Sequence, residues 1–137
     1  MSDPNPSSRP VIMMVDDSAT ILRSAEFFLP DVQLEKFTNA YDALGAVARL
    51  RPSVCFLDVQ MPGVSGYDLC FIIKDSEDLA ATPVYMVSGE TTAVDIQRAA
   101  VHLCDGYITK PFREVQLRET VARHVPGFPL VRPPKEG

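Results

Sequence analysis

The stretch FLDVQMPG, residues 56–63, joins an apolar run to an acid and then to a turn. Its first two residues have the character of a buried strand, Asp58 follows at once, and Pro62 and Gly63 mark a loop. Because an unpaired charge is costly to bury, two interpretations of Asp58 are open. It either caps a turn or is brought by the strand to the edge of a sheet as a nucleophile or a metal ligand.

Three continuous apolar runs are typical of parallel strands that helices cover on both faces. They are VIMMV at 11–15, SVCFL at 53–57 and PVYMV at 83–87. A more polar strand is predicted at 32–37, at an edge of the sheet because charged residues interrupt its pattern. A short strand is predicted at 106–108.

Segments with a helical spacing of apolar residues separate these strands. The predicted helices span residues 18–29, 39–51, 66–74, 93–103 and 113–125. Ser18 and Asn39 are residues that cap helix N-termini, and Pro30 and Pro52 follow the predicted helix ends. The alternation of strand and helix predicts an α/β fold, a parallel sheet with helices on both faces joined by right-handed crossovers.

Length and charge narrow the class of protein. The chain has 137 residues, enough for one domain, and a formal net charge of -5 with a pI of about 4.9. An acidic chain lacks the basic face that nucleic-acid phosphates require, so we expect no direct nucleic-acid partner. No apolar run approaches the roughly 20 residues that span a bilayer, so we expect no membrane insertion. Three cysteines without a CxxC pair indicate reduced thiols in a cytoplasmic protein.

The two ends of the chain differ in composition from its middle. Residues 1–10 are polar and proline-rich, and residues 126–137 contain four prolines. Proline suits neither a helix interior nor a central strand. The sequence therefore predicts two flexible tails around one domain at 11–125.

Polar residues follow the predicted strands at the points where they end. Asp16 and Asp17 follow the first strand, Asp58 the third, Ser88 the fourth and Lys110 the fifth. Each residue alone has an ordinary explanation as a helix cap, a turn former or a solvated lysine. Because the carboxyl ends of parallel strands gather ligands at a topological switch point, all five together favour one functional crevice.

The charges of this set indicate its chemistry. Three carboxylates facing one ammonium leave an excess of negative charge, and oxygen ligands without His or Cys favour Mg²⁺. Mg²⁺ beside an aspartate points to phosphoryl transfer with the aspartate as acceptor. We expect Asp58 to be the nucleophile, Asp16 and Asp17 to hold the metal, Lys110 to counter the phosphoryl charge and Ser88 to bond a phosphoryl oxygen.

Four motifs in this order resemble the successive signatures of the response-regulator receiver domain. They are MMVDDS at 13–18, FLDVQMPGVSGYDL at 56–69, VYMVSGE at 84–90 and YITKPF at 107–112. The resemblance covers the whole predicted domain. It implies a flavodoxin-like, CheY-like doubly wound sheet of five strands in the order 2-1-3-4-5, with five helices.

The same resemblance implies a role for each matching residue. Asp58 would be the phosphoacceptor, Asp17 a direct Mg²⁺ ligand, Asp16 a largely water-mediated one, and the backbone carbonyl of Gln60 a further ligand. Ser88 and Tyr107 match the switch pair, and Pro111 after Lys110 matches a proline that is usually cis.

The resemblance also implies the partners. The phosphoryl donor would be a phosphohistidine of a sensor histidine kinase or of a histidine phosphotransfer domain. A downstream protein target would bind the surface of the fourth helix, fifth strand and fifth helix, which includes Val94, Gln97, Arg98, Tyr107 and Gln116. With no output domain expected after the last helix, the chain is similar to stand-alone regulators, and in finer detail to those of type IV pilus chemosensory systems used in twitching motility.

Three other readings compete with this one. An aspartate-nucleophile phosphatase of the haloacid dehalogenase type needs a second acid two residues after the nucleophile, where this chain has Gln60. A phosphorylation-independent scaffold with the receiver fold is the second alternative. The third is a receiver excised from a larger hybrid kinase or transcription regulator.

Overall fold

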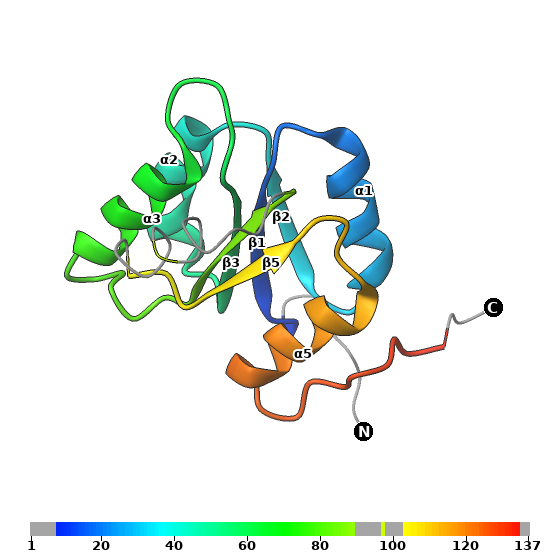
Figure 1. Ribbon diagram of the computed structural model, residues 1–137. Helices are drawn as coiled ribbons and strands as arrows, with labels where there is room; N and C mark the ends of the chain where they lie inside the picture. Colours follow the sequence, from blue (N-terminus) through cyan, green and yellow to red (C-terminus); the bar gives the residue numbers. More distant parts are fainter. Residues whose placement is uncertain (1–7, 90–96, 98–102, 135–137) are drawn as a thin grey trace.

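The computed structural model describes residues 8–89, 97 and 103–134, in which five parallel strands form one sheet in the order β2-β1-β3-β4-β5 (Figure 1). The strands are β1 Val11–Val15, β2 Gln33–Phe37, β3 Val54–Asp58, β4 Val84–Ser88 and β5 Gly106–Thr109. The helices are α1 Ala19–Phe28, α2 Ala40–Leu50, α3 Gly66–Asp75 and α5 Glu114–His124. The doubly wound sheet and its strand order are therefore confirmed.

The position of each strand follows from its side chains. β1, β3 and β4, which come from the continuous apolar runs, occupy the three central positions, and almost all of their residues are buried. A central parallel strand has helices over both faces, so both alternating sets of its side chains are apolar. β2 and β5 lie at the edges and are more exposed, as the charged residues of β2 predict.

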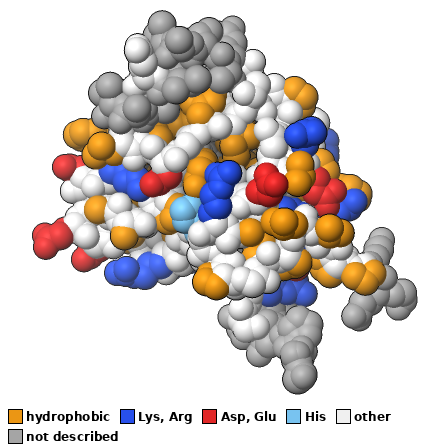
Figure 2. Space-filling view, turned by 60° about the horizontal axis from the view of Figure 1, so that its bottom comes forward, with side chains coloured by type: hydrophobic (Ala, Val, Ile, Leu, Met, Phe, Trp, Pro, Cys, Tyr) orange, Lys and Arg blue, Asp and Glu red, His pale blue; other side chains and the backbone are white. Residues whose placement is uncertain are grey.

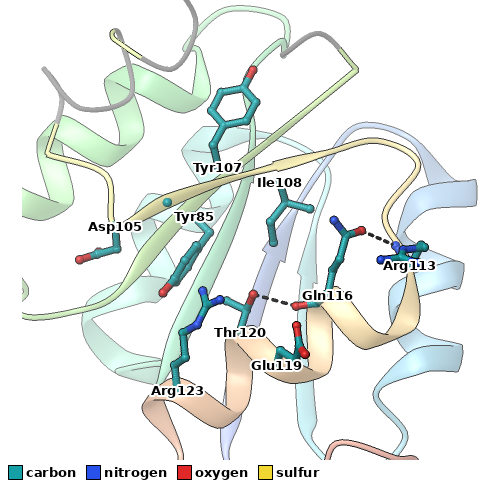
Figure 3. A pocket seen from close by; sticks show the side chains of 10 residues that line it. Tyr85, Asp105, Tyr107, Ile108, Arg113, Gln116, Glu119, Thr120 and Arg123 are labelled. Carbon is teal, nitrogen blue, oxygen red and sulfur yellow. Dashed lines mark hydrogen bonds between the residues drawn. The ribbon is translucent and has the colours of Figure 1, made fainter. Parts of the chain in front are cut away.

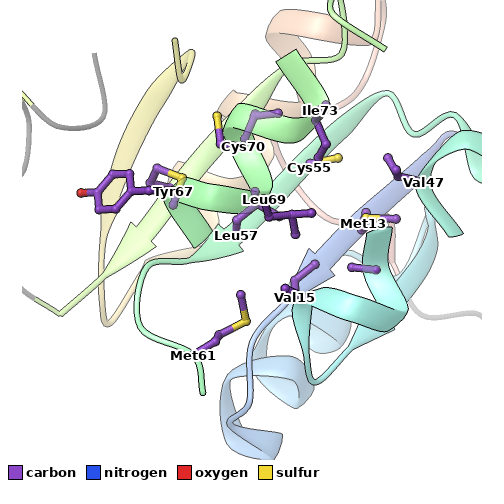
Figure 4. Packing of buried hydrophobic residues seen from close by; sticks show 14 of the residues in the cluster. Met13, Val15, Val47, Cys55, Leu57, Met61, Tyr67, Leu69, Cys70 and Ile73 are labelled. Atoms are coloured by element: carbon purple, nitrogen blue, oxygen red, sulfur yellow. The ribbon is translucent and has the colours of Figure 1, made fainter. Parts of the chain in front are cut away.

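Alternate strand residues pack into two separate clusters, one on each face of the sheet. The cluster beneath α2 and α3 is drawn in part in Figure 4 and includes Met13, Val47, Leu57, Leu69, Cys70 and Ile73. The cluster on the other face, beneath α1 and α5, includes Ile12, Leu22, Phe56, Tyr85, Leu117 and Val121. The two clusters make the three-layer architecture that leaves only the ends of the strands open for function.

The helix ends agree with the caps that the sequence predicts. The Ser18 side chain accepts a hydrogen bond from Ile21 N, and the Asn39 side chain accepts one from Asp42 N. α3 begins with a reciprocal capping box, because Ser65 and Asp68 each accept from the backbone N–H of the other. This box is not among the helix caps that the sequence predicts.

The fourth of the five predicted helices, at 93–103, falls almost wholly outside the described residues. Of that segment the structure describes Gln97, which is helical and exposed, and Leu103, which has a positive φ of 64°. Four helices are therefore described, against the five that were predicted.

A buried arginine joins the last helix to the first and to the chain beyond. Arg118 of α5 is fully buried, and its guanidinium donates to both carboxylate oxygens of Asp31 at 3.0 and 2.8 Å. It also donates to Phe28 O at 2.9 Å and to Pro129 O at 3.1 Å. Such pairing is what allows a charged group to be buried.

The boundaries of the domain at residues 11 and 125 stay predictions.

Candidate functional site

Three carboxylates meet where β1 and β3 end. Asp16 and Asp17 follow β1 directly, and Asp58 is the last residue of β3, the strand beside β1. Each of the three offers an oxygen atom within 4.8 Å of those of the other two. Asp16 and Asp58 are only 1% and 5% exposed, whereas Asp17 is exposed. The topology thus places two nearly buried acids side by side.

One lysine serves both buried acids. Lys110 follows β5, and its Nζ lies 2.7 Å from Oδ2 of Asp16 and 3.1 Å from Oδ1 of Asp58. Its backbone N–H donates to Ser88 O at 2.7 Å, which extends the pairing of β5 with β4 and holds the residue in place. Burial lowers the pKa of Lys110, but the bonds and attraction to Asp16 and Asp58 outweigh it and raise the pKa overall. The lysine is therefore a permanent cation at neutral pH.

The single ammonium does not neutralise the cluster. Burial raises the pKa of Asp58 above its ordinary 3.8, and repulsion by Asp16 raises it further. The bonds from Lys110 and from the Gln60 N–H, at 3.1 and 3.3 Å, offset these effects only in part. The site is thus electrostatically poised to accept another cation.

The donor atoms fit Mg²⁺. Every ligating group in the cluster is a carboxylate, the type of ligand that selects hard cations. Oδ2 of Asp16 is buried, and among the described atoms its close contact is the ion pair with Lys110 Nζ at 2.7 Å, with no further hydrogen bond assigned to it. A metal or its coordinated water would satisfy that oxygen. The predicted contribution of the Gln60 carbonyl stays a prediction, because only its N–H is fixed, by Asp58.

Ser88 comes from β4, the strand beside β3, and Tyr107 comes from β5, the edge strand beyond β4. Ser88 ends β4, is 7% exposed and lies opposite Thr109 of β5, while Tyr107 lies opposite Met86. Tyr107 is half-buried against the α2–α3 cluster, whereas Ile108 belongs to the cluster beneath α5. Figure 3 shows the side chains of Tyr107 and Ile108 on opposite faces of β5. Ser88 and Tyr107 are therefore two steps apart along neighbouring strands.

A hollow of about 470 Å³ runs along β5 and α5 (Figure 3). Its lining includes Tyr85, Tyr107, Arg113, Gln116, Thr120 and Arg123. Two residues predicted for the partner surface, Tyr107 and Gln116, thus line one concave area, and Gln97 is exposed. The other two, Val94 and Arg98, lie outside the described residues.

Gly66 has a structural role that the sequence analysis did not predict. A Cβ atom at this position would lie 2.1 Å from the backbone oxygen of Asp58 and 2.7 Å from Cε of Met86. The Gly66 N–H also donates to Val59 O at 3.2 Å. The start of α3 therefore rests directly on the strand end that carries Asp58, and only glycine permits that approach. The signal in the sequence is a glycine immediately after a capping serine.

The fold and the site together indicate a class of protein. A doubly wound sheet that presents three carboxylates and one lysine at the carboxyl ends of its strands is the architecture of a signalling receiver with an acidic crevice. Residues 12–122 match the family described as "Response regulator receiver domain". The chain belongs to this family and is a receiver of the two-component response-regulator type, a class of signalling protein that interacts with sensor kinases and downstream targets.

Several known proteins are similar to this chain over most of its length. Protein PilG of Pseudomonas aeruginosa is 36% identical over 119 residues, which cover 85% of this chain and 88% of PilG. The DNA-binding response regulator MtrA of Mycobacterium tuberculosis is 33% identical over 117 residues, 82% of this chain, and the match spans about half of MtrA, 47%. The structure of chemotaxis protein CheY4 of Vibrio cholerae has a TM-score of 0.80 and 25% identity, with 86% of this chain and all of CheY4 covered.

Among the described helices, none has both the length and the hydrophobicity that crossing a bilayer requires.

Proposed function

We propose that Asp58 accepts a phosphoryl group from a phosphohistidine of a sensor kinase or of a histidine phosphotransfer domain. A carboxylate oxygen of Asp58 attacks phosphorus, the P–N bond breaks, and the imidazole leaves with the bonding electrons. One observation carries the proposal: Asp58 ends the central strand with Lys110 Nζ at 3.1 Å, beside two more carboxylates. That arrangement combines a nucleophile with its counter-charge at an open strand end.

The other residues of the crevice position and neutralise the phosphoryl group. Asp16 and Asp17 would hold Mg²⁺ together with Asp58 and the Gln60 carbonyl. Bound Mg²⁺ would offset the negative charge of the carboxylates and of the phosphoryl oxygens. Lys110 would turn from Asp58 toward a phosphoryl oxygen once the carboxylate is phosphorylated to an acyl phosphate, because phosphorylation removes the carboxylate charge that now attracts it. Its second contact, with Asp16 at 2.7 Å, would keep it in the crevice during this change.

Ser88 and Tyr107 are proposed to transmit the phosphorylation. A phosphoryl oxygen offers the Ser88 hydroxyl a charge-assisted hydrogen bond, which draws the end of β4 inward. The ring of Tyr107, half-buried two residue steps away on β5, would then turn further into the space that is vacated. Since Tyr107 and Gln116 line the same hollow, this movement would alter its shape.

The hollow along β5 and α5 is part of the surface proposed to bind a downstream protein. Acidic and basic side chains are interspersed with hydrophobic ones over the described part of the face in Figure 2. A mixed surface of this kind suits a protein partner, whereas nucleic acid requires a basic one. The resemblance to regulators of type IV pilus chemosensory systems, with the match over 88% of PilG, supports placing the chain in a pathway of that kind.

Acetyl phosphate, a small-molecule phosphodonor, tests the chemistry. With Mg²⁺ the parent protein should gain the mass of one acid-stable, base-labile phosphoryl group, and with a chelator it should gain none. Asp58→Asn should not be labelled, whereas Asp78→Asn, which changes an exposed aspartate of the α3–β4 connection, should be labelled like the parent. Equal labelling of the Asp58 variant and the parent would reject Asp58 as the acceptor.

The switch has a separate readout. On phosphorylation, the NMR ring signals of Tyr107 should move toward those of a buried ring, while Ser88→Ala should label at Asp58 without that movement. Ring signals that move equally in the parent and in Ser88→Ala would show that Ser88 does not transmit the change.

A further inference from the structure

Two cysteines far apart in the sequence lie against each other beneath α3. The Sγ atoms of Cys70 and Cys104 are 3.0 Å apart, and the residues are separated by 34 positions. Cys70 lies on α3, and Cys104 lies in the turn just before β5. The separation is about 1 Å longer than a disulfide bond. Both thiols are reduced in the structure, and neither takes part in the crevice described above.

Charged neighbours hold the two thiols in this position. Lys74, one turn after Cys70 on α3, pairs its Nζ with Oδ2 of Asp105 at 2.7 Å and donates to Thr82 O at 2.6 Å. Asp105, the residue after Cys104, also accepts from Val84 N at 2.7 Å and donates its own N–H to Val84 O at 2.7 Å. The ion pair thus spans the same two segments as the thiols, so the alignment of the sulfur atoms does not depend on the thiol contact alone.

The three cysteines of the chain differ in access. Cys104 is half-buried, so a small oxidant reaches it from solvent, whereas Cys55 and Cys70 are 0% exposed. In Figure 4 the sulfur of Cys70 points away from Cys55. Burial also raises the pKa of Cys55 to about 12, which leaves it an unreactive thiol at neutral pH. Cys55 therefore serves as an internal control.

The proton between the two paired sulfur atoms is shared unequally. The hydrogen bond with Cys104 lowers the pKa of Cys70, against the opposing effect of burial, and the Lys74 ammonium lowers it further. The same hydrogen bond, followed by burial, raises the pKa of Cys104. Cys70, the buried thiol, is therefore the one of the pair that ionises more readily, and Cys104 is the one in contact with solvent.

We propose that Cys70 and Cys104 are a modification site, a dithiol that a hydroperoxide converts into a reversible intramolecular disulfide. Cys104 first passes the shared proton to the Cys70 thiolate, and the resulting Cys104 thiolate attacks a peroxide oxygen, so that the O–O bond breaks and a sulfenic acid forms. The leaving hydroxide becomes water by taking from solvent the proton that the pair released when it ionised. Cys70 sulfur then attacks the sulfenic sulfur, the S–O bond breaks, and the departing hydroxide takes the Cys70 proton as a second water. In sum, two thiols and one hydrogen peroxide give one disulfide and two waters, and a dithiol reductant reverses the change.

The link would join α3 covalently to the segment that leads into β5. Tyr107 lies three residues after Cys104, so oxidation would restrain the strand that carries the proposed switch. This last consequence rests on the proposed function, but the disulfide itself does not. Failure of phosphorylation at Asp58 would leave the thiol chemistry untouched.

Hydrogen peroxide applied to the reduced full chain, in the presence of a chelator, tests the site. The number of titratable thiols in the denatured protein should fall from three to one. The mass should fall by two hydrogen atoms, peptide mapping should recover Cys70 joined to Cys104, and dithiothreitol should restore all three thiols. Because the link closes a long loop, the oxidised monomer should melt roughly 5–15 °C higher than the reduced one.

Matched variants decide whether the pair is responsible. Cys55→Ala should form the same link as the parent, whereas Cys104→Ser, which changes a half-buried position and should fold, should lose the reversible step and the gain in Tm. Three thiols that persist after peroxide, a link that involves Cys55, or oxidation only to sulfinic acid or to dimers would each overturn the proposal.

Discussion

The ammonium of Lys110 lies 3.1 Å from Oδ1 of Asp58, a residue 52 positions earlier in the chain. The contact crosses from the edge strand β5 to the end of the central strand β3, with β4 between them. The same ammonium lies 2.7 Å from Asp16, so one cation serves two nearly buried acids. The shared ammonium reduces the repulsion between the two acids. The three carboxylates of the crevice still carry more negative charge than one lysine neutralises.

Removal of the shared counter-ion should destabilise the protein. Lys110→Met leaves Asp16 and Asp58 facing each other, so the free energy of unfolding should fall by about 1–3 kcal/mol in urea titrations without metal. The raised pKa of Lys110 means that its contribution is complete below its ordinary 10.5 and is lost only as the pH rises past the raised value, so pH 7 is a suitable condition. Lys36→Met, which breaks an exposed pair with Glu26, should cost under about 1 kcal/mol. Equal losses in the two variants would contradict this assignment.

The pKa of Asp58 predicts how stability depends on pH in the absence of metal. Burial and repulsion by Asp16 raise this pKa above 3.8, so the folded protein binds the proton more tightly than the unfolded chain. Stability should therefore fall as the pH rises from the ordinary value through the raised one, and the penalty should persist at neutral pH. Asp58→Asn should remove it and raise stability at pH 7 by about 1 kcal/mol.

The comparison for this experiment is Asp17→Asn, which alters the exposed member of the cluster. Its unfolding free energy in chelator should change less than that of Asp58→Asn. Tm is measured for both proteins from pH 4 to pH 8. If Tm changes with pH in the same way in the parent and in Asp58→Asn, Asp58 has no raised pKa.

Mg²⁺ should stabilise the folded state by mass action. At ten times a millimolar dissociation constant, the gain should be about 1.4 kcal/mol, seen as a rise of a few degrees in Tm. Asp16→Asn and Asp17→Asn each remove a predicted ligand and should lose most of the gain. NaCl of matched ionic strength provides the control, and a Tm that rises equally with either salt would argue against a specific site.

Two glycines offer a matched test of the packing at the strand end. Gly66→Ala would place a Cβ 2.1 Å from the backbone of Asp58, so we expect a loss of about 1–3 kcal/mol and reduced phosphorylation. Gly45→Ala, within α2, meets no atom within 4 Å and should be neutral or stabilising by up to about 1 kcal/mol. Denaturant unfolding of both variants checks the contrast, and a Gly66→Ala protein as stable as Gly45→Ala would contradict the close approach.

Much of the fold follows from local patterns in the sequence. Continuous apolar runs predict β1, β3 and β4, because a strand covered on both faces has no polar side. Charged residues within 32–37 predict an edge position for β2, which the structure confirms. The caps at Ser18 and Asn39 are equally local and are also confirmed.

Contacts between distant segments could not be predicted in this way. Residue type alone favours exposure of Arg118, and its burial depends on Asp31, 87 positions earlier. The pairing of Cys70 with Cys104 depends on the rotation of α3 and on the path of the chain into β5. Likewise, a lysine after the last strand predicts a counter-charge, but only the geometry shows that Asp16 and Asp58 share it.

Chemical trapping of the phosphorylated residue tests the central claim most directly. Protein phosphorylated with acetyl phosphate and Mg²⁺ is treated with borohydride, which reduces an aspartyl phosphate to homoserine and leaves free carboxylates unchanged. Peptide sequencing should then find homoserine at position 58 in the parent and in Asp78→Asn, and no homoserine in Asp58→Asn. Homoserine at position 16 or 17, or none in a parent protein that carries the phosphoryl mass, would contradict Asp58 as the phosphoacceptor.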